Sequence, residues 1–272
     1  MKNAISIDLE DWFCAGNLSE VTPYANWRDS ELRIEASTRK LLTILDAHGV
    51  MATFFVLGWI AERVPELVRE IADGGHEIAL HGYAHQPITE QTPQIFERDL
   101  RRSLDALHNV VDTEITGFRA PSFTVTHETM WAIDVLARHG LRYDSSIFPV
   151  GFHPDYGVAD APLEIYDHPQ GVREFPMSVA EILGKRIPCS GGGYFRLLPY
   201  AATRALLRRC NGAGRPFVFY LHPWEVDPTQ PRVRIPLTKR FRHYVNLRRT
   251  YDRLDRLLGD FEFTTVREVL AV

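Results

Sequence analysis

The stretch Ala4-Ile5-Ser6-Ile7-Asp8-Leu9-Glu10-Asp11 is an apolar run that ends in three carboxylates within four residues. Similar short apolar runs recur along the chain, and each is followed by a loop and then by an amphipathic segment. This alternation is typical of strands that are joined by crossover helices. It predicts an α/β fold, either a barrel or a doubly wound sheet.

Short runs that are rich in β-branched or aromatic residues predict the strands. These runs are Ala4–Asp8, Ala52–Val56, Glu77–Leu80, Ile115–Phe118, Arg173–Phe175, Phe217–Leu221 and Phe261–Thr264. Apolar residues at helical spacing predict the helices, two of which are closed by glycine. These helices are about Glu35–His48, Pro65–Asp73, Thr92–Val111 and the segment from Val245 to Leu258. Long loops are predicted at Phe13–Arg28, Phe148–Gly171 and Pro223–Pro236.

The composition limits the class of protein. The chain has 272 residues, of which 45% are hydrophobic, so we expect one domain over residues 1–272, with a C-terminal extension over about 223–272. A net charge of -4 gives no whole-chain attraction to nucleic acid. The cysteines Cys14, Cys189 and Cys210 have no paired short spacing, which argues against a disulfide framework. The acidic N-terminal stretch and the lack of a long apolar run predict a cytoplasmic protein without a membrane span.

Polar residues follow several predicted strands at the point where each strand ends. They are Asp8, His81, Arg119 and His222, with Asp144 after the short run Leu141–Tyr143. A parallel α/β barrel builds its active site at the carboxyl ends of its strands. We therefore expect these side chains to meet in one site.

Two motifs indicate a metal site. In His81-Gly82-Tyr83-Ala84-His85 the histidines are four residues apart, and Gly82 and the later Pro87 favour a tight loop over a helix. The alternative is that both histidines are surface or core residues. The carboxylates of Asp8, Glu10 and Asp11 repel one another unless a cation compensates, although a solvated strand end is the alternative.

Two histidines and one carboxylate make a three-ligand site that leaves positions open for water and substrate, as catalytic zinc requires. Zn²⁺ is the expected ion, and Co²⁺, Ni²⁺ and Fe²⁺ also suit these ligands. Arg119, presented by Pro121, can hold a carboxylate in place. His222, before Pro223, can supply an acid. This inventory is sufficient to hydrolyse an amide without a covalent nucleophile.

The order of these motifs, from the Asp-rich strand through His-x-x-x-His, Arg-x-Pro and an Asp-Ser turn to a late Leu-His, resembles the polysaccharide deacetylases. These form carbohydrate esterase family four, the NodB-homology domain. The segments Asp8–Phe13 and Ser190–Pro199 are similar to a cytoplasmic branch associated with bacterial exopolysaccharide biosynthesis. The resemblance implies a distorted (β/α)7 barrel. It also implies removal of N-acetyl groups from N-acetylhexosamine residues of a poly- or oligosaccharide.

The resemblance also implies roles for single residues. Asp8 becomes the general base and Arg119 orients it. His222 becomes the general acid, and Asp144 lines the pocket or supports that histidine.

His81 and His85 become metal ligands by the same resemblance. The third ligand is open between Glu10 and Asp11, because this chain has Asp-Leu-Glu-Asp where most members have Asp-Asp-Gly. Strand alternation places Glu10 on the face of Asp8, whereas aspartate is the commoner ligand type.

Three further residues are candidates for substrate binding. Arg196 follows three glycines that let the backbone approach a ligand, while Tyr194 and Trp224 offer aromatic faces to a sugar ring. The expected partner is an N-acetylated carbohydrate. Two alternatives remain at this point: hydrolysis of another small or carrier-linked amide, and a carbohydrate-binding relative without activity.

Overall fold

The computed structural model describes residues 1–151 and 156–272. Residues 152–155, which belong to the predicted loop Phe148–Gly171, lie outside these ranges. Within the described part of the chain, no helix has the length and apolar character that a membrane span requires.

The strands are short, and most carry few polar residues. They are β1 (Lys2–Leu9), β2 (Thr53–Val56), β3 (Glu77–Leu80), β4 (Gly117–Phe118), β5 (Tyr143–Asp144), β6 (Tyr166–Asp167), β7 (Arg173–Glu174), β8 (Val179–Ile182), β9 (Lys185–Pro188), β10 (Val218–Leu221) and β11 (Glu262–Thr264).

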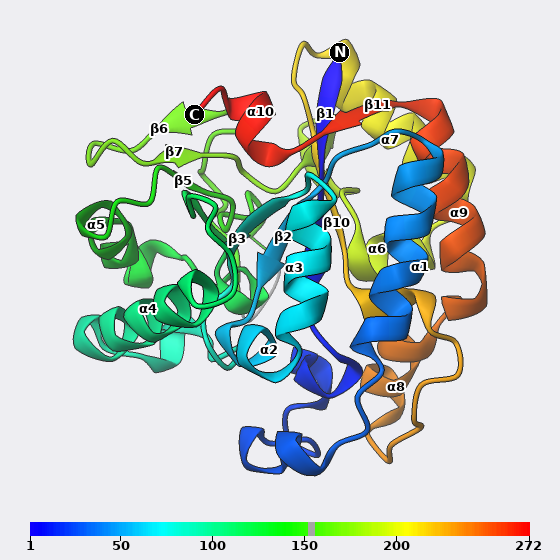
Figure 1. Cartoon of the computed structure of the whole chain (residues 1–272). Helices are drawn as coiled ribbons and strands as arrows, with labels where there is room; N and C mark the ends of the chain where they lie inside the picture. Colours follow the sequence, from blue (N-terminus) through cyan, green and yellow to red (C-terminus); the bar gives the residue numbers. More distant parts are fainter. Residues whose placement is uncertain (152–155) are drawn as a thin grey trace.

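Helices surround the sheet (Figure 1). The α-helices are α1 (Ile34–Ala47), α2 (Gly58–Arg63), α3 (Pro65–Asp73), α4 (Pro93–His108), α5 (Trp131–Arg138), α6 (Gly192–Leu197), α7 (Tyr200–Gly212), α8 (Leu237–Tyr244), α9 (Leu247–Asp260) and α10 (Val266–Leu270). Short 3₁₀ helices cover Trp12–Cys14, Gly16–Leu18, Tyr24–Asp29, Ile88–Glu90, Pro121–Phe123, His127–Thr129 and Pro223–Val226.

The main sheet is a strongly curled, open barrel, which confirms the predicted α/β fold. Its strand order is β10-β1-β2-β3-β4-β5-β7-β6, with β11 also paired to the start of β1. Seven of these strands, from β10 to β7, are mutually parallel, and only β6 runs antiparallel to its neighbour. The β8–β9 hairpin forms a separate sheet, and Gly191 makes an isolated parallel bridge to Tyr220 beside it.

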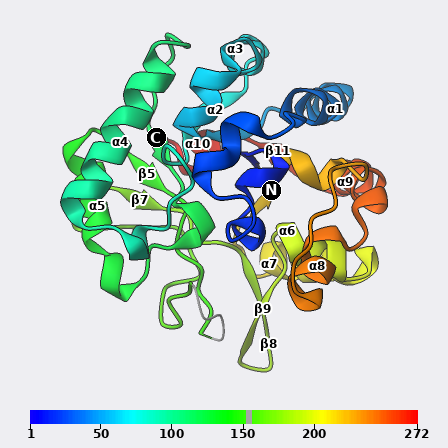
Figure 2. The same ribbon diagram turned by 90° about the horizontal axis from the view of Figure 1, so that it is seen from below.

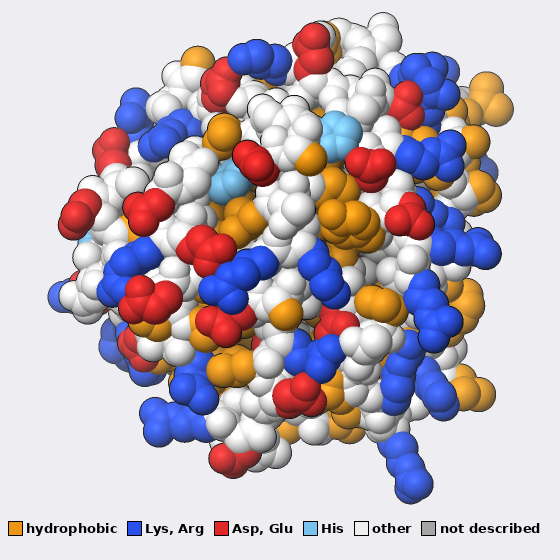
Figure 3. All heavy atoms as spheres, turned by 45° about the vertical axis from the view of Figure 1, so that its right-hand side comes forward, with side chains coloured by type: hydrophobic (Ala, Val, Ile, Leu, Met, Phe, Trp, Pro, Cys, Tyr) orange, Lys and Arg blue, Asp and Glu red, His pale blue; other side chains and the backbone are white. Residues whose placement is uncertain are grey.

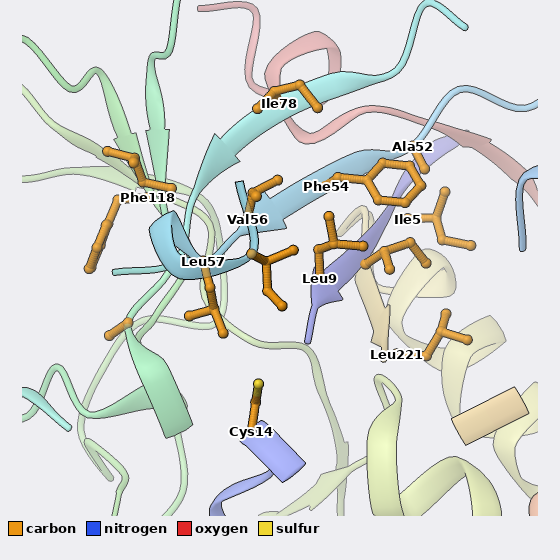
Figure 4. Packing of buried hydrophobic residues seen from close by; sticks show 14 of the residues in the cluster. Ile5, Leu9, Cys14, Ala52, Phe54, Val56, Leu57, Ile78, Phe118 and Leu221 are labelled. Carbon is orange, nitrogen blue, oxygen red and sulfur yellow. The ribbon is translucent and has the colours of Figure 1, made fainter. Parts of the chain in front are cut away.

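Alternation along β1 decides which side chains enter the barrel. Ile5 and Leu9 point outward into the layer between sheet and helices, together with Phe54 and Val56 of β2 (Figure 4). Ala4 belongs to a second, inner cluster. Successive side chains of a strand point to opposite faces. Ser6 and Asp8, which are two and four places after Ala4, therefore also point inward.

The inner cluster fills the barrel with apolar side chains and is covered by the last helix. Val266 and Leu270 of α10 pack there with Phe55 and Tyr143. The N-terminal ends of the strands are therefore packed closed, while their carboxyl ends face the loops that Figure 2 shows from below.

Helix bounds follow local signals closely. α4 begins where Pro93 occupies the first turn and the Thr92 hydroxyl accepts from the Ile95 N–H at 3.3 Å. It ends at His108, three residues before the predicted end. The predicted bounds of α3 and β3 agree with the structure residue for residue.

Candidate active site

Asp8 and Glu10 lie on the inner face at the end of β1. The Glu10 N–H donates to the Asp8 carbonyl at 2.9 Å, so the strand ends in a tight turn that keeps both side chains inside. Both are 2% exposed. Two carboxylates are thus held close together away from solvent.

The loop from His81 to His85 brings two imidazoles to the same place. The structure has the predicted tight loop rather than a helix. Gly82 has φ 74°, where a Cβ would meet the Asp99 carboxylate at 3.2 Å, and His85 itself adopts φ 54°. A non-glycine residue in this region is uncommon, and such backbone strain often occurs at functional sites.

Three donor atoms converge between the strand end and this loop. Glu10 Oε1 lies 3.3 Å from His81 Nε2 and 3.2 Å from His85 Nε2, and all three atoms lie within 4.8 Å of one another. The Nδ1 atom of His81 is 2.8 Å from the Arg119 carbonyl oxygen, which fixes Nδ1–H as the donor and leaves the Nε2 lone pair facing Glu10. The donor set and the fixed tautomer fit a divalent cation of the zinc type.

Asp11 is engaged elsewhere. One of its carboxylate oxygens accepts from Trp12 N at 2.7 Å, and the other accepts from Arg33 N at 2.7 Å and Ile34 N at 3.0 Å. Burial raises its pKa to about 6, although these three N–H groups oppose the change. The structure therefore brings Glu10, and not Asp11, to the two histidines.

Arg119 anchors Asp8 from inside the barrel. Its guanidinium is fully buried and donates from Nη1 to Asp8 Oδ1 and to Ser6 Oγ, each at 2.7 Å. Ser145 accepts from the other nitrogens through its carbonyl and its hydroxyl, at 3.0 and 3.1 Å. These bonds hold one oxygen of Asp8 and leave Oδ2 toward the metal-ligand cluster.

His222 approaches the same cluster from β10. Its Nε2 lies 3.6 Å from Glu10 Oε1 and 3.8 Å from Asp8 Oδ2, and 17% of its side chain is exposed. The other ring nitrogen, Nδ1, lies 2.7 Å from Glu225 Oε1. Glu225 in turn accepts from Arg196 Nε at 2.5 Å. A buried Arg–Glu–His chain thus ends at the site.

The charges in this cluster stabilise one another. Burial by itself would lower the pKa of His222, but Glu10 and Glu225 raise it to about 9. Burial would raise the pKa of Glu225, but Arg196 and His222 lower it to about 2. Burial likewise opposes ionisation of Glu10, yet the charges of His85 and His222 hold its pKa well below the usual range. The described arrangement has a charged carboxylate and a protonated imidazole at neutral pH.

Asp144 does not support His222, contrary to one expected role. It is fully buried, accepts from Ser146 Oγ at 2.5 Å, and its partner carboxylate is Glu174. Ser146 also accepts from the Ala120 N–H at 2.7 Å. Asp144 therefore braces the turn beside Arg119, and the carboxylate on His222 is Glu225.

The Asp144–Glu174 pair predicts a stability effect. Burial raises the pKa of Glu174 from 4.5 to about 7, and burial with the Glu174 charge raises that of Asp144 well above its usual value. The folded state keeps protons that the unfolded chain releases, so the free energy of unfolding falls as pH rises from about 4.5 to 7. Glu174→Gln should be more stable than the native chain at pH 8, by about 1–3 kcal/mol, and lose this advantage near pH 4.5. Thermal unfolding at both pH values measures this difference in the free energy of unfolding. If the free energy of unfolding changed with pH in the same way for the two proteins, the prediction would be wrong.

The structure does not support Arg196 as a substrate ligand. Its side chain is 2% exposed, and besides Glu225 it donates to the carbonyls of Arg242 and His243 at 3.0 and 2.7 Å. Two of the three preceding glycines, Gly191 and Gly192, closely approach Tyr220 of the protein itself. A Cβ at Gly191 would lie 1.9 Å from the Tyr220 carbonyl oxygen.

The aromatic candidates are packed as well. Trp224 is 5% exposed and has His222 stacked at 5.1 Å and His243 at 4.4 Å, so neither face is free for a sugar. Tyr194 is half-buried and packs against Phe148 at 6.5 Å. Of the predicted substrate ligands, only Tyr194 retains exposed surface.

Sequence reasoning missed Glu225, yet a signal was present. His222, Pro223 and Glu225 form the pattern of a helix start, in which the residue three places after the cap reaches back to it. The structure has that capping box and a 3₁₀ helix at Pro223–Val226, which corrects the start of the long loop predicted at Pro223–Pro236. Proline suits the first position of a helix because its missing N–H is not needed there.

Two family matches cover most of the chain. Residues 25–143 match the polysaccharide deacetylase family, and residues 145–271 match DUF3473, a domain family of unknown function. The junction falls at β5, inside one continuous sheet. His81, His85 and Arg119 lie in the first matched range and His222 lies in the second, whereas Asp8 and Glu10 precede both.

Known proteins agree with the first match. A peptidoglycan deacetylase-like protein of Gibberella zeae is 34% identical over 131 residues, which are 47% of this chain and 38% of that protein. The chain thus spans about two fifths of this curated relative. A solved structure from Mycobacterium smegmatis, assigned to the polysaccharide deacetylases, has a TM-score of 0.61 at 20% identity and covers 100% of this chain and 90% of its own. Puue allantoinase has a TM-score of 0.63 at 12% identity, covering 98% and 88%. The two structures show the same fold.

Proposed function

We propose that this chain is a metal-dependent hydrolase that removes N-acetyl groups from N-acetylhexosamine residues of a poly- or oligosaccharide. The match of residues 25–143 to the polysaccharide deacetylase family supports the proposal, and residues 145–271 match DUF3473. The observation that carries the proposal is the convergence of Glu10, His81 and His85 beside Asp8 and His222. Its setting in exopolysaccharide biosynthesis rests on the similarity of two motifs alone.

Glu10, His81 and His85 are the proposed metal ligands. Their donor atoms share one small space, and Asp8, Glu10 and His222 form a second overlapping group. When bound, a divalent cation of the zinc type polarises an amide carbonyl and makes water a stronger acid. Asp8, held by Arg119, and His222, held by Glu225, are not needed as metal ligands. They therefore remain available for proton transfer.

Asp8 is the proposed general base. Arg119 holds Oδ1, so Oδ2 is the oxygen that faces the site and can take a proton from an attacking water. Ser6 and Ser145 hold the guanidinium itself, which fixes the direction of the carboxylate.

His222 is the proposed general acid. An amide nitrogen leaves poorly as an anion, so cleavage requires a proton on it. The Nδ1–H of His222 is bonded to Glu225, which leaves Nε2–H toward the reaction site.

Acetate release tests the proposed function. We expect the purified chain to release acetate from N-acetylglucosamine oligomers, to lose activity with a chelator, and to regain it with Zn²⁺ or Co²⁺. A panel that includes carrier-linked N-acetylhexosamines and allantoin separates the substrate classes. Absence of release from every sugar, under any of the metals, would sink the deacetylase proposal.

Glu225 is proposed to position His222, and its neutral isostere tests this. Glu225→Gln retains the shape but removes the charge between Arg196 and His222. We expect kcat to fall about 10- to 100-fold with KM nearly unchanged, because the group acts on the acid and touches no substrate. Glu66→Gln, at an exposed site on α3, is the matched control. A change in KM alone would contradict the assignment.

A further inference from the structure

A basic surface runs through the C-terminal part of the chain. Between Asp227 and Asp252 the sequence has seven Lys and Arg residues and no Asp or Glu. They are Arg232, Arg234, Lys239, Arg240, Arg242, Arg248 and Arg249. All except Lys239 are exposed, whereas the whole chain has a net charge of -4. In Figure 3, Lys and Arg side chains gather down the lower right of the molecule, on the side where α8 and α9 lie in Figure 1.

Helix α8 adds an apolar pair to this surface. Leu237 is 79% exposed and Phe241 is 62% exposed, and residues four apart lie on the same side of a helix. At the end of α8, His243 and Tyr244 are buried, and Arg196 binds the last carbonyls from below. The helix is therefore anchored to the protein while its apolar pair faces outward.

We propose that α8 and its flanking basic residues bind the surface of a bilayer that contains anionic phospholipids. Leucine and phenylalanine insert at the boundary between headgroups and acyl chains, while arginine and lysine remain at the level of the phosphates. A soluble polyanion would use the charges but leave Leu237 and Phe241 in water. The combination therefore favours a membrane surface over a nucleic acid or an acidic polysaccharide.

The surface lies at the rim of the candidate active site. Lys239 of α8 pairs with Glu20 at 2.9 Å, and α8 packs beside the 3₁₀ helix Gly16–Leu18. A Cβ at Gly16 would lie 3.9 Å from the His85 ring. Figure 2 likewise shows α8 at the edge of the face on which the strands end. Docking through α8 would hold this face close to the membrane, whether or not the proposed deacetylase activity is correct.

Vesicle co-sedimentation of the full chain, with a chelator present, tests the proposal apart from catalysis. We expect the partition coefficient to be at least about 10-fold higher on vesicles of phosphatidylcholine with phosphatidylglycerol than on phosphatidylcholine alone, and to fall in high salt. Leu237→Ser with Phe241→Ser should lower binding to the mixed vesicles at least about 10-fold. Arg234→Gln with Arg240→Gln and Arg248→Gln should do the same.

A matched triple variant on α4, Ile95→Ser with Arg98→Gln and Arg101→Gln, removes one exposed apolar and two exposed basic side chains elsewhere and should bind as the native chain does. Asp8→Asn should also bind normally, which separates this proposal from the proposed function. Equal binding to both kinds of vesicle, or no binding, overturns the proposal. The proposal is also wrong if the α4 control loses as much vesicle binding as the α8 variants do. Binding of the chain to heparin without binding to vesicles would overturn it as well.

Discussion

Glu10→Gln is expected to weaken binding of Zn²⁺ or Co²⁺ at least about 100-fold, because it removes the charged donor that lies beside the two histidine nitrogens. Asp11→Ala is expected to leave metal binding unchanged. It should instead lower the free energy of unfolding by about 2 kcal/mol or more, since three backbone N–H groups lose their acceptor. Calorimetric titration with metal and thermal unfolding measure the two effects separately.

This pair of variants decides between the two carboxylates that the sequence left open. The two residues are adjacent, and both are nearly fully buried. Glu10→Gln should nevertheless change metal binding, whereas Asp11→Ala should change the free energy of unfolding. Weak metal binding by Asp11→Ala together with normal binding by Glu10→Gln would overturn the ligand assignment.

Asp8→Asn is expected to lower kcat about 10³-fold while the metal stays bound. The amide oxygen still accepts from Arg119, so the geometry is retained, but the group facing the site can no longer take up a proton. Acetate release per bound metal ion measures the effect. Asp73→Asn, an exposed change at the end of α3, serves as the control.

The opposite pattern would assign Asp8 another role. If Asp8→Asn lost its metal and its activity together, Asp8 would be a ligand, as its membership of the second donor group with Glu10 and His222 allows. Retention of full activity would exclude it from the reaction.

Much of the fold could be predicted because local signals coincide with the tertiary structure. Pro65 and the glycines after Asp73 mark both ends of α3, and an uninterrupted apolar run marks β3. β6, which lies within the predicted loop Phe148–Gly171, and the β8–β9 hairpin were not foreseen. β6 has only two residues and therefore shows no periodicity, and the hairpin has a polar composition that includes Glu181 and Lys185.

The candidate site was predictable in its position, but of the contacts behind it only the His222–Glu225 pair had a local signal in the sequence. The carboxyl ends of parallel strands meet at one edge, and alternation placed Glu10 beside Asp8. The burial of Arg196 depends on Glu225 and on carbonyls nearly fifty residues further along the chain. Trp224 similarly lies between two histidines from different segments. Contacts between segments so far apart in the chain, such as those of Arg196 with the His243 carbonyl and of Trp224 with the His243 ring, cannot be predicted from composition or spacing.

The central strand has a consequence for synthesis on the ribosome. β1 is made long before β10, although one of its edges pairs with β10 through contacts such as Ala4 with Val218. At roughly 5–20 residues per second, that partner emerges on the order of 10–40 s later. During this interval the strand that carries Asp8 has an open hydrogen-bonding edge flanked by isoleucines, which is a template for aggregation. Nascent chains of this protein should therefore depend on chaperones until the late strand has been made.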